Sequence, residues 1–149
     1  MAHMGGSATE EIDAPLQEVW AVVEDVVSAP EWQGGLVSIT PLEHDGEGRP
    51  TLVESENDIK VRHVKTQVRF AYEPPTRLSW TQEKGDLKSV EGAWVLEDLG
   101  NGRTKATYEL DSDPGRVLGL LLRGPLESAV TAMLVNARPG ELKKRMEGA

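Results

Sequence analysis

The stretch from Val64 to Tyr72, VKTQVRFAY, decides the fold, because polar and apolar side chains alternate along it. Alternation with a period of two is typical of a β-strand that buries one face. The predicted inward face carries Val64, Thr66, Val68, Phe70 and Tyr72, and the outward face carries Lys65, Gln67 and Arg69. We therefore predict an antiparallel sheet with one buried and one solvated face.

The same period continues on both sides of this stretch, and turn-forming residues separate the repeats. The predicted strands are 36–42, 51–59, 61–72, 77–84, 87–97 and 104–110. Pro74-Pro75 and several glycine-rich segments mark the turns between them. The further inward positions are predicted to be Leu78, Trp80, Gln82, Gly92, Trp94, Leu96, Ala106, Tyr108 and Leu110.

Helical patterns flank the strands. A short strand over 7–12 precedes Asp13 and Pro15, which favour a helix start, and apolar residues then recur at helical spacing as far as Val27. A second short helical turn leads to Trp32. Near the C-terminus, a long helix is predicted from 124 to 147, and Pro139-Gly140 is expected to kink or interrupt it. These elements predict an α+β fold.

Length and composition predict one globular domain. The chain has 149 residues and a net charge of −9, which argues against nucleic-acid binding because phosphates need a concentrated basic surface. There is no cysteine, and no apolar run approaches the length of a membrane span. The start lacks the pattern of a secretory signal, so we expect a cytoplasmic location. Residues 1–6 resemble a cloning remnant, and the domain is predicted to occupy 7–149.

Several short motifs carry a family resemblance over nearly the whole chain. They are Ile12-Asp13-Ala14-Pro15, Glu18-Val19-Trp20, Pro30-Glu31-Trp32, Leu78-Ser79-Trp80, Gly92-Ala93-Trp94-Val95-Leu96, Gly102-Arg103-Thr104-Lys105-Ala106-Thr107-Tyr108 and Leu142-Lys143-Lys144. In this order they resemble the polyketide cyclase/dehydrase and lipid-transport proteins of the START / Bet v 1-like (SRPBCC) superfamily. The sequence also resembles those of actinobacteria, which suggests a bacterial source.

The resemblance implies a helix-grip fold. In that fold a strongly curved antiparallel sheet wraps a long C-terminal helix, two short helices follow the first strand, and a cavity lies between sheet and helix. Members bind lipids, sterols, polyketides, hormones or quinones, and some are cyclases or hydrolases, so the family predicts fold better than reaction. Two departures are Pro139-Gly140 in the terminal helix and the lack of the gate and latch motifs of plant hormone receptors.

The predicted ligand contacts are mostly aromatic and apolar side chains on the inward face. Plain core packing is the alternative interpretation of each. Trp32 is included because relatives place a cavity-rim residue there, and a few inward polar groups could orient a ligand. The predicted contacts are Trp32, Val53, Ser55, Thr66, Val68, Phe70, Trp80, Gln82, Trp94, Tyr108, Leu118, Leu122, Val130, Met133 and Leu134.

Candidates for catalysis are few. Tyr72 and Tyr108 are predicted to face inward, and Arg62 shares their side of the strand pattern. His63 is predicted to face solvent, and His44 lies in a hairpin loop. No Ser–His–Asp order, phosphate loop or carboxylate pair is present, and no cofactor or metal site is predicted.

Three functions remain open at this level. The first is binding or carriage of a hydrophobic molecule such as a lipid, fatty acid or polyketide-like ring. The second is a cyclase/dehydrase-type enzyme acting on such a ligand. The third is a protein-interaction module without a ligand. Under any of the three, the protein is expected to be a monomer or a homodimer. The leucine-rich segment from Val117 to Gly124 fits a lid over the cavity, a contact patch or plain core.

Overall fold

The computed structural model describes residues 4–148, which form one seven-stranded antiparallel sheet and the helices packed on it. The strand order is β1-β7-β6-β5-β4-β3-β2. The strands are β1 (Met4–Ile12), β2 (Leu36–His44), β3 (Pro50–Asp58), β4 (His63–Glu73), β5 (Arg77–Gly85), β6 (Ser89–Gly100) and β7 (Arg103–Asp113). The helices are α1 (Leu16–Glu24), η1 (Val26–Glu31), α2 (Gly115–Leu121), α3 (Pro125–Thr131), η2 (Ala132–Asn136) and α4 (Arg138–Glu147).

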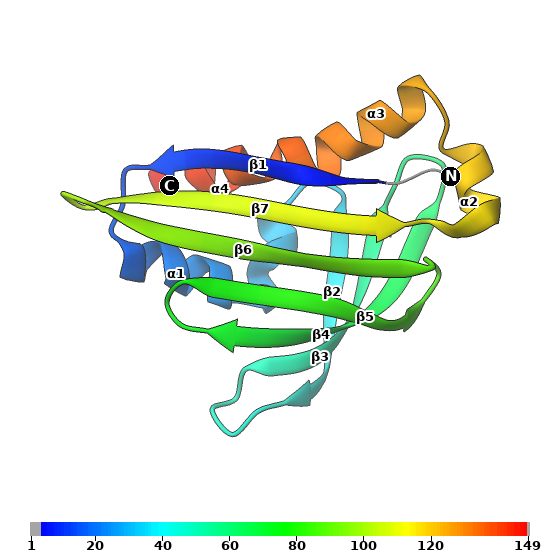
Figure 1. Ribbon diagram of the computed structural model, residues 1–149. Coiled ribbons are helices and arrows are strands. Elements are labelled where there is room, and N and C mark those ends of the chain that lie inside the picture. The colour runs from blue at the N-terminus through cyan, green and yellow to red at the C-terminus, as the bar shows by residue number, and fades with distance from the viewer. Residues whose placement is uncertain (1–3, 149) are drawn as a thin grey trace.

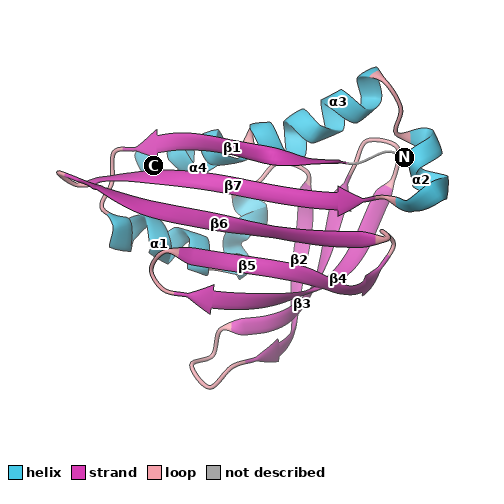
Figure 2. Ribbon diagram, in the orientation of Figure 1, coloured by secondary structure: helices cyan, strands magenta, loops and turns pink. Residues whose placement is uncertain are grey.

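The sheet is strongly curved, and its concave face holds the core. In Figure 1, β1, β7 and β6 run across the front, whereas β2 at the other end of the sheet crosses behind them. Figure 2 shows the helices gathered on one side of the sheet. The last helix contacts β1, while α1 and η1 contact β6 and β2. The predicted α+β helix-grip architecture is therefore confirmed.

The predicted inward face is the buried face. Val64, Leu78, Leu96 and Ala106 are almost completely buried. Directly paired residues on neighbouring strands bring large side chains together, as at Phe70↔Trp80, Leu78↔Trp94 and Trp94↔Tyr108. The alternation in the sequence was sufficient to orient these side chains because each strand buries one face only.

The first strand begins earlier than predicted. Residues 4–6 form the start of β1 and pair with Leu110–Ser112 of β7, and the Met4 side chain is buried. Residues 1–3 of the proposed cloning remnant lie outside the described residues. A strand starting at Ser7 was expected because residues 1–6 resemble a cloning remnant, but β7 pairs with the backbone of Gly5 and Gly6.

The first helix ends earlier than predicted. Val19, Trp20 and Val23 are buried as expected, but α1 ends at Glu24, and Val27 is 48% exposed. Asp25, with φ −80° and ψ 73°, leaves the helical region, and the next turn is a 3₁₀ helix. A 3₁₀ helix has three residues per turn, so Val26 and Ala29 take the buried positions instead.

The C-terminal helix, residues 125–147, changes pitch just before Pro139. A π-helical turn, η2, precedes the proline, and the Ala137 N–H donates to the Ala132 carbonyl at 2.9 Å. Pro139 then lies in the first turn of α4, where its missing N–H removes no helical bond. The α-helix is therefore interrupted as expected, but by a wider turn that lies just before Pro139-Gly140.

The leucine-rich segment is partly core and partly exposed. Leu118 and Leu122 are buried, whereas Val117, Leu120 and Leu121 are 73%, 57% and 53% exposed. No single helix among residues 4–148 is both long and apolar enough to span a membrane. The pair formed by α2 and the C-terminal helix meets that test only jointly, across a bend of 109°.

Candidate ligand-binding cavity

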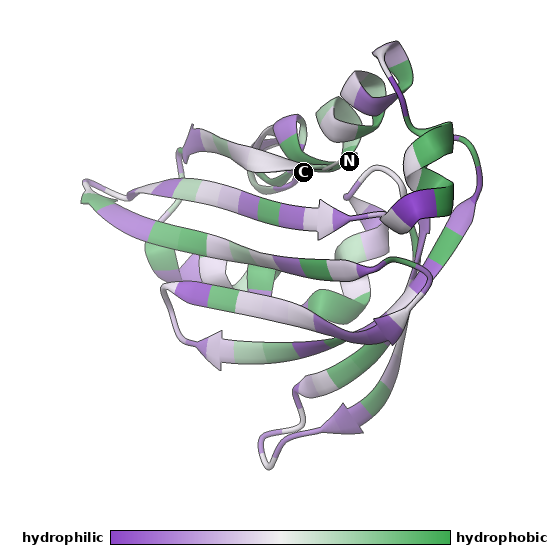
Figure 3. Ribbon diagram, turned by 45° about the vertical axis from the view of Figure 1, so that its right-hand side comes forward, coloured by the Kyte–Doolittle hydropathy of each residue, from purple (hydrophilic) through white to green (hydrophobic). Residues whose placement is uncertain are grey.

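A cavity of about 130 Å³ lies within the core, between the concave face of the sheet and the helices. One water needs roughly 10–15 Å³ on this measure, so the space suits an organic molecule of about ten non-hydrogen atoms. The wall is mostly apolar. Figure 3 shows the underlying pattern, with hydrophobic and hydrophilic positions alternating along the strands.

Aromatic rings form one wall of this cavity. The ring of Tyr108 lies edge-on to Trp94 with centroids 4.8 Å apart, and the Trp80 and Tyr108 centroids are 5.6 Å apart. Phe70 extends this wall beyond Trp80 at 6.1 Å. Pairs at these distances stabilise each other beyond simple burial of area. The wall is therefore a pre-formed surface against which an apolar ligand can pack.

The structure places about half of the predicted ligand contacts on the wall. Those that line the cavity are Ser55, Thr66, Val68, Phe70, Trp80, Trp94, Tyr108 and Leu134. The predicted contacts that lie off the wall are Trp32, Val53, Gln82, Leu118, Leu122, Val130 and Met133. The reason why a residue lies away from the cavity differs from one of these residues to the next.

Most of these residues are held by other neighbours. Val53, Leu122 and Val130 are fully buried, and Leu118 nearly so, as ordinary packing. The Trp32 ring packs on Trp94 at 6.2 Å. Met133 lies beside Gly35, and the Gln82 side-chain amide donates to the Leu87 carbonyl at 2.9 Å. Strand and helix periodicity identifies buried positions but does not separate cavity wall from solid core.

One small polar cluster lies on the wall at β3 and β4. The hydroxyls of Ser55 and Thr66 are 2.8 Å apart and share a hydrogen bond, and the Asn57 amide donates to the Ser55 hydroxyl at 3.5 Å. Their mutual bonds make this cluster largely self-satisfied. Hydroxyl and amide oxygens still leave spare acceptor capacity for a ligand.

Several of the described lining residues were not among the predicted contacts, and Arg138 is the charged one among them. It lines the cavity, and only 2% of its surface is exposed. The signal was available, since Val130, Leu134, Arg138 and Leu142 recur every four residues along one helix face, and all four are buried. It was overlooked because an arginine is rarely buried without a partner.

Glu141 is the partner that allows Arg138 to be buried. Nη1 of Arg138 donates to Glu141 Oε1 at 2.8 Å and to the Gly34 carbonyl at 2.9 Å. Glu141 Oε2 in turn accepts from the Gly34 N–H at 2.9 Å. The three residues, which we call the Gly34 clamp, fix the C-terminal helix to the segment before β2. The guanidinium carbon lies 5.6 Å from the centre of the Tyr108 ring.

The candidate catalytic residues do not meet in the cavity. The Tyr72 hydroxyl donates to the Pro50 carbonyl at 2.5 Å, and burial raises the pKa of this tyrosine. Arg62 is exposed, precedes β4 and donates to the neighbouring carbonyl of His63. Only Tyr108 of the three lines the cavity, and burial raises its pKa although Arg138 opposes the shift. Tyr108 is therefore protonated near neutral pH.

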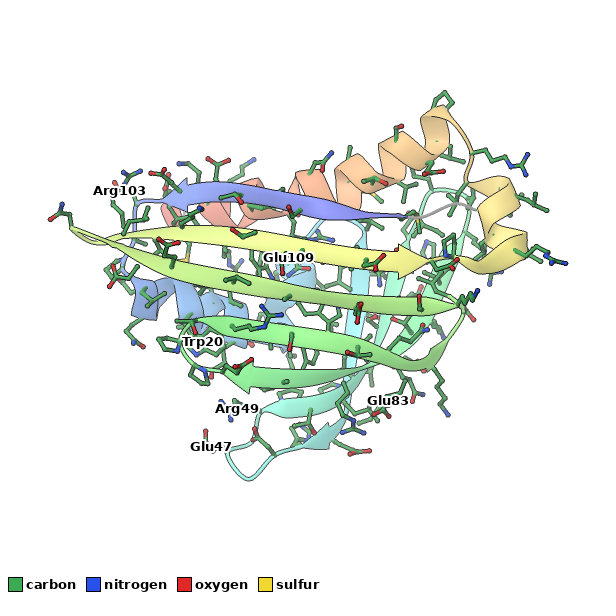
Figure 4. The ribbon with its side chains drawn as sticks, in the orientation of Figure 1. Trp20, Glu47, Arg49, Glu83, Arg103 and Glu109 are labelled. Atoms are coloured by element: carbon green, nitrogen blue, oxygen red, sulfur yellow. The ribbon has the colours of Figure 1, made fainter. Side chains whose placement is uncertain are left out.

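Most charged groups lie away from the cavity. His63 is exposed, and its hydrogen bond to Glu56 raises the pKa of the imidazole. His44 is also exposed. Figure 4 places Glu47 and Arg49 at the β2–β3 hairpin, where Arg49 pairs with Asp45 at 2.9 Å. Within the described part of the chain, no group of three or more His, Asp or Glu side chains is placed to hold a metal ion.

Gly92 makes room for the aromatic wall. It faces Trp80 across β5 and β6, and a Cβ added there would lie 2.6 Å from the Trp80 ring and 2.7 Å from the Glu109 carbonyl. We expect Gly92→Ala to push Trp80 away and to destabilise the protein by about 1–3 kcal/mol. Urea unfolding followed by circular dichroism measures the loss.

Gly140 provides the matched control for this substitution. A Cβ added at Gly140 meets nothing within 4 Å among the described residues, and the position is helical. Gly140→Ala is expected to stabilise the protein by about 0.5–1 kcal/mol. Equal effects of the two substitutions would contradict the role assigned to Gly92.

Comparison with known proteins agrees with this geometry. Residues 12–137 match the family "Polyketide cyclase / dehydrase and lipid transport". A START superfamily protein from Mycobacterium smegmatis superposes with a TM-score of 0.82 at 19% identity, covering 97% of each chain. The Zhui aromatase/cyclase from Streptomyces sp. R1128 superposes with a TM-score of 0.79 at 19% identity, covering 97% of this chain and 94% of that one.

A protein from Thermus thermophilus is similar to the same degree, with a TM-score of 0.81 at 18% identity over 97% of each chain. Among curated proteins, none matches the chain. At these identities the solved structures establish the fold, while the family match extends over most of the sequence. The chain therefore belongs to the polyketide cyclase/dehydrase and lipid transport family.

Proposed function

We propose that this protein binds or carries a hydrophobic small molecule in the cavity between the sheet and the C-terminal helix. The observation that carries the proposal is the cavity itself. An aromatic and aliphatic wall surrounds a space of about 130 Å³ that the side chains of the core leave open. Burial of apolar ligand surface against such a wall supplies binding free energy at roughly 25 cal/mol per Å².

The catalytic alternative rests on a narrower observation. Tyr108 and Arg138 lie side by side at the cavity wall, and both carry N–H or O–H groups that could polarise a ligand oxygen. The chemistry of a cyclase also needs a group that removes a proton. Tyr72, Arg62 and His63 all lie elsewhere, so binding without reaction is the function that the geometry favours.

The interaction-module alternative is less well supported. The exposed side chains of Val117, Leu120 and Leu121 on α2 form the apolar patch that it would need. It also requires a filled interior, and the cavity counts against that requirement.

Ligand binding is expected to raise the thermal stability of the protein. A compact aromatic probe, 4-ethylacetophenone, at a hundred times its Kd should stabilise the folded state by about 2.7 kcal/mol. For a chain of this size that corresponds to a rise in Tm of about 5–10 °C. Differential scanning calorimetry measures the shift, and fluorescence of Trp80 and Trp94 on the wall reports the Kd.

Two variants separate binding in the cavity from binding to the surface. Leu110→Trp adds bulk to a residue of the wall and is expected to abolish the shift. Leu121→Ala removes an exposed side chain of α2 and is expected to leave the shift unchanged. Loss of the shift in Leu121→Ala alone would move the binding site to the α2 surface.

A further inference from the structure

Arg138 is a charged group in an otherwise uncharged cavity. Among the described residues that line the cavity, no other Arg, Lys, Asp or Glu is present. Burying an ion is costly unless every one of its hydrogen bonds is made. Glu141 balances the charge of Arg138, but the hydrogen bonds of the Arg138 guanidinium are not all made within residues 4–148.

The Gly34 clamp uses only part of the guanidinium. Both hydrogen bonds that Arg138 makes in the clamp come from Nη1, although a guanidinium carries five N–H groups. Nε is fully buried and has no hydrogen-bond partner among residues 4–148. A buried donor without an acceptor destabilises the protein, so a ligand oxygen that reaches Nε recovers this lost free energy on binding.

Tyr108 adds a second donor beside Arg138. Its ring lies under the guanidinium, and its neighbours Trp80 and Trp94 form the aromatic wall. Burial raises the pKa of its hydroxyl, so the proton is present at neutral pH and can be donated. The polar end of the cavity therefore presents donors to a ligand oxygen.

The charges of Arg138 and Glu141 determine which kind of ligand oxygen fits best beside them. Glu141 already neutralises Arg138 at 2.8 Å. A ligand carboxylate beside this pair would leave one negative charge without a counterion in a cavity whose described lining holds no second cation. A neutral acceptor such as a ketone carbonyl can accept from the unpartnered Nε–H without adding charge.

We propose that Arg138 is the polar anchor of the cavity and that it holds a neutral carbonyl oxygen of an otherwise apolar ligand. This inference rests on the proposed binding function and specifies the substrate class for the same site. Two observations support the inference. Nε of Arg138 has no hydrogen-bond partner among the described residues, and Glu141 already neutralises the charge of Arg138.

Three probes of similar shape test the anchor. They are 4-ethylacetophenone, 1,4-diethylbenzene and 4-ethylbenzoate, which offer a ketone, no oxygen and an ionised carboxylate. Their Kd values are measured by titration calorimetry at pH 7.5. For the chain without substitutions, we expect the ketone to bind about tenfold more tightly than the hydrocarbon. A hydrogen bond to a charged group gives a preference of about this size. The carboxylate should bind more weakly than the ketone.

Variants of the ion pair distinguish an anchor from a structural role. Arg138→Met should leave hydrocarbon binding within about threefold and reduce the ketone preference to about one. Glu141→Gln keeps an oxygen for Nη1 but removes the negative charge, so 4-ethylbenzoate should gain about tenfold while the ketone changes little. Arg77→Met, which removes the arginine from the surface pair with Glu73, is the matched control and should preserve the ranking of the unsubstituted chain.

The outcomes separate the two proposals. If none of the probes binds the chain without substitutions, both the proposed binding function and the proposed role of Arg138 are wrong. If all three bind with similar Kd values, or if Arg138→Met keeps the ketone preference, the cavity binds apolar molecules but Arg138 is not its anchor. If Arg138→Met does not fold, the Kd values of the three probes for Glu141→Gln decide whether Arg138 is the anchor. A purely structural role of Arg138 does not predict that only the carboxylate binds more tightly to this variant.

Discussion

Substitution of Trp94 by alanine is expected to lower the free energy of unfolding by about 4 kcal/mol, as removal of a buried tryptophan does. Only 2% of Trp94 is exposed, and its ring contacts those of Tyr108 at 4.8 Å and Trp32 at 6.2 Å. The loss combines the transfer of the ring to water with a new void at the centre of the aromatic wall. A domain is typically stable by only about 5–15 kcal/mol, so the effect is large.

Urea unfolding followed by far-ultraviolet circular dichroism measures this loss. Leu120→Ala is the matched control, because Leu120 is 57% exposed and its removal should change stability by less than about 0.5 kcal/mol. A loss below about 1.5 kcal/mol for Trp94→Ala would mean that the core collapses into the void. In that case the aromatic wall would not be a rigid surface.

Replacement of Glu141 by alanine is expected to destabilise the protein by about 3 kcal/mol, because it leaves the Arg138 charge buried without its partner. The expected value lies at the low end for buried pairs, since the Glu141 side chain is 24% exposed and water can reach the site. The substitution also removes the acceptor of the Gly34 N–H.

A double-mutant cycle tests this explanation. The variant Arg138→Met/Glu141→Ala removes the buried charge as well, and we expect it to be more stable than Glu141→Ala alone. The surface pair of Glu73 and Arg77, 3.8 Å apart, supplies the control, and Glu73→Ala should cost less than about 1 kcal/mol. If the double variant is the less stable one, Arg138 contributes packing and not an uncompensated charge.

The cytoplasmic location, the bacterial source and the choice between monomer and homodimer stay predictions. The assignment of 1–6 to a cloning remnant also stays a prediction, although residues 4–6 take part in β1. The exposed part of α2, with Leu120 and Leu121, is compatible with a lid or a contact surface.

The elements that the sequence predicted best are those whose pattern is local. Val64 to Tyr72 alternates with a period of two, and the structure buries that face because one side of the sheet meets the helices. The errors are local too. Val27 turned outward because a 3₁₀ turn replaced the last turn of α1, and the C-terminal helix is interrupted by a π turn just before Pro139 and not at it. Such changes of helical pitch leave no clear signature in composition.

By itself, the sequence determined the strands, their buried faces and the family, because each depends on short-range periodicity or on motifs that are contiguous in the chain. The tertiary structure alone decided which buried residues line the cavity, and that Arg138 is one of them. The Gly34 clamp joins residues 104 and 107 positions apart. Only folding brings a charge, its counterion and an aromatic wall to one place, so the unpartnered Nε of Arg138 could not be predicted from spacing.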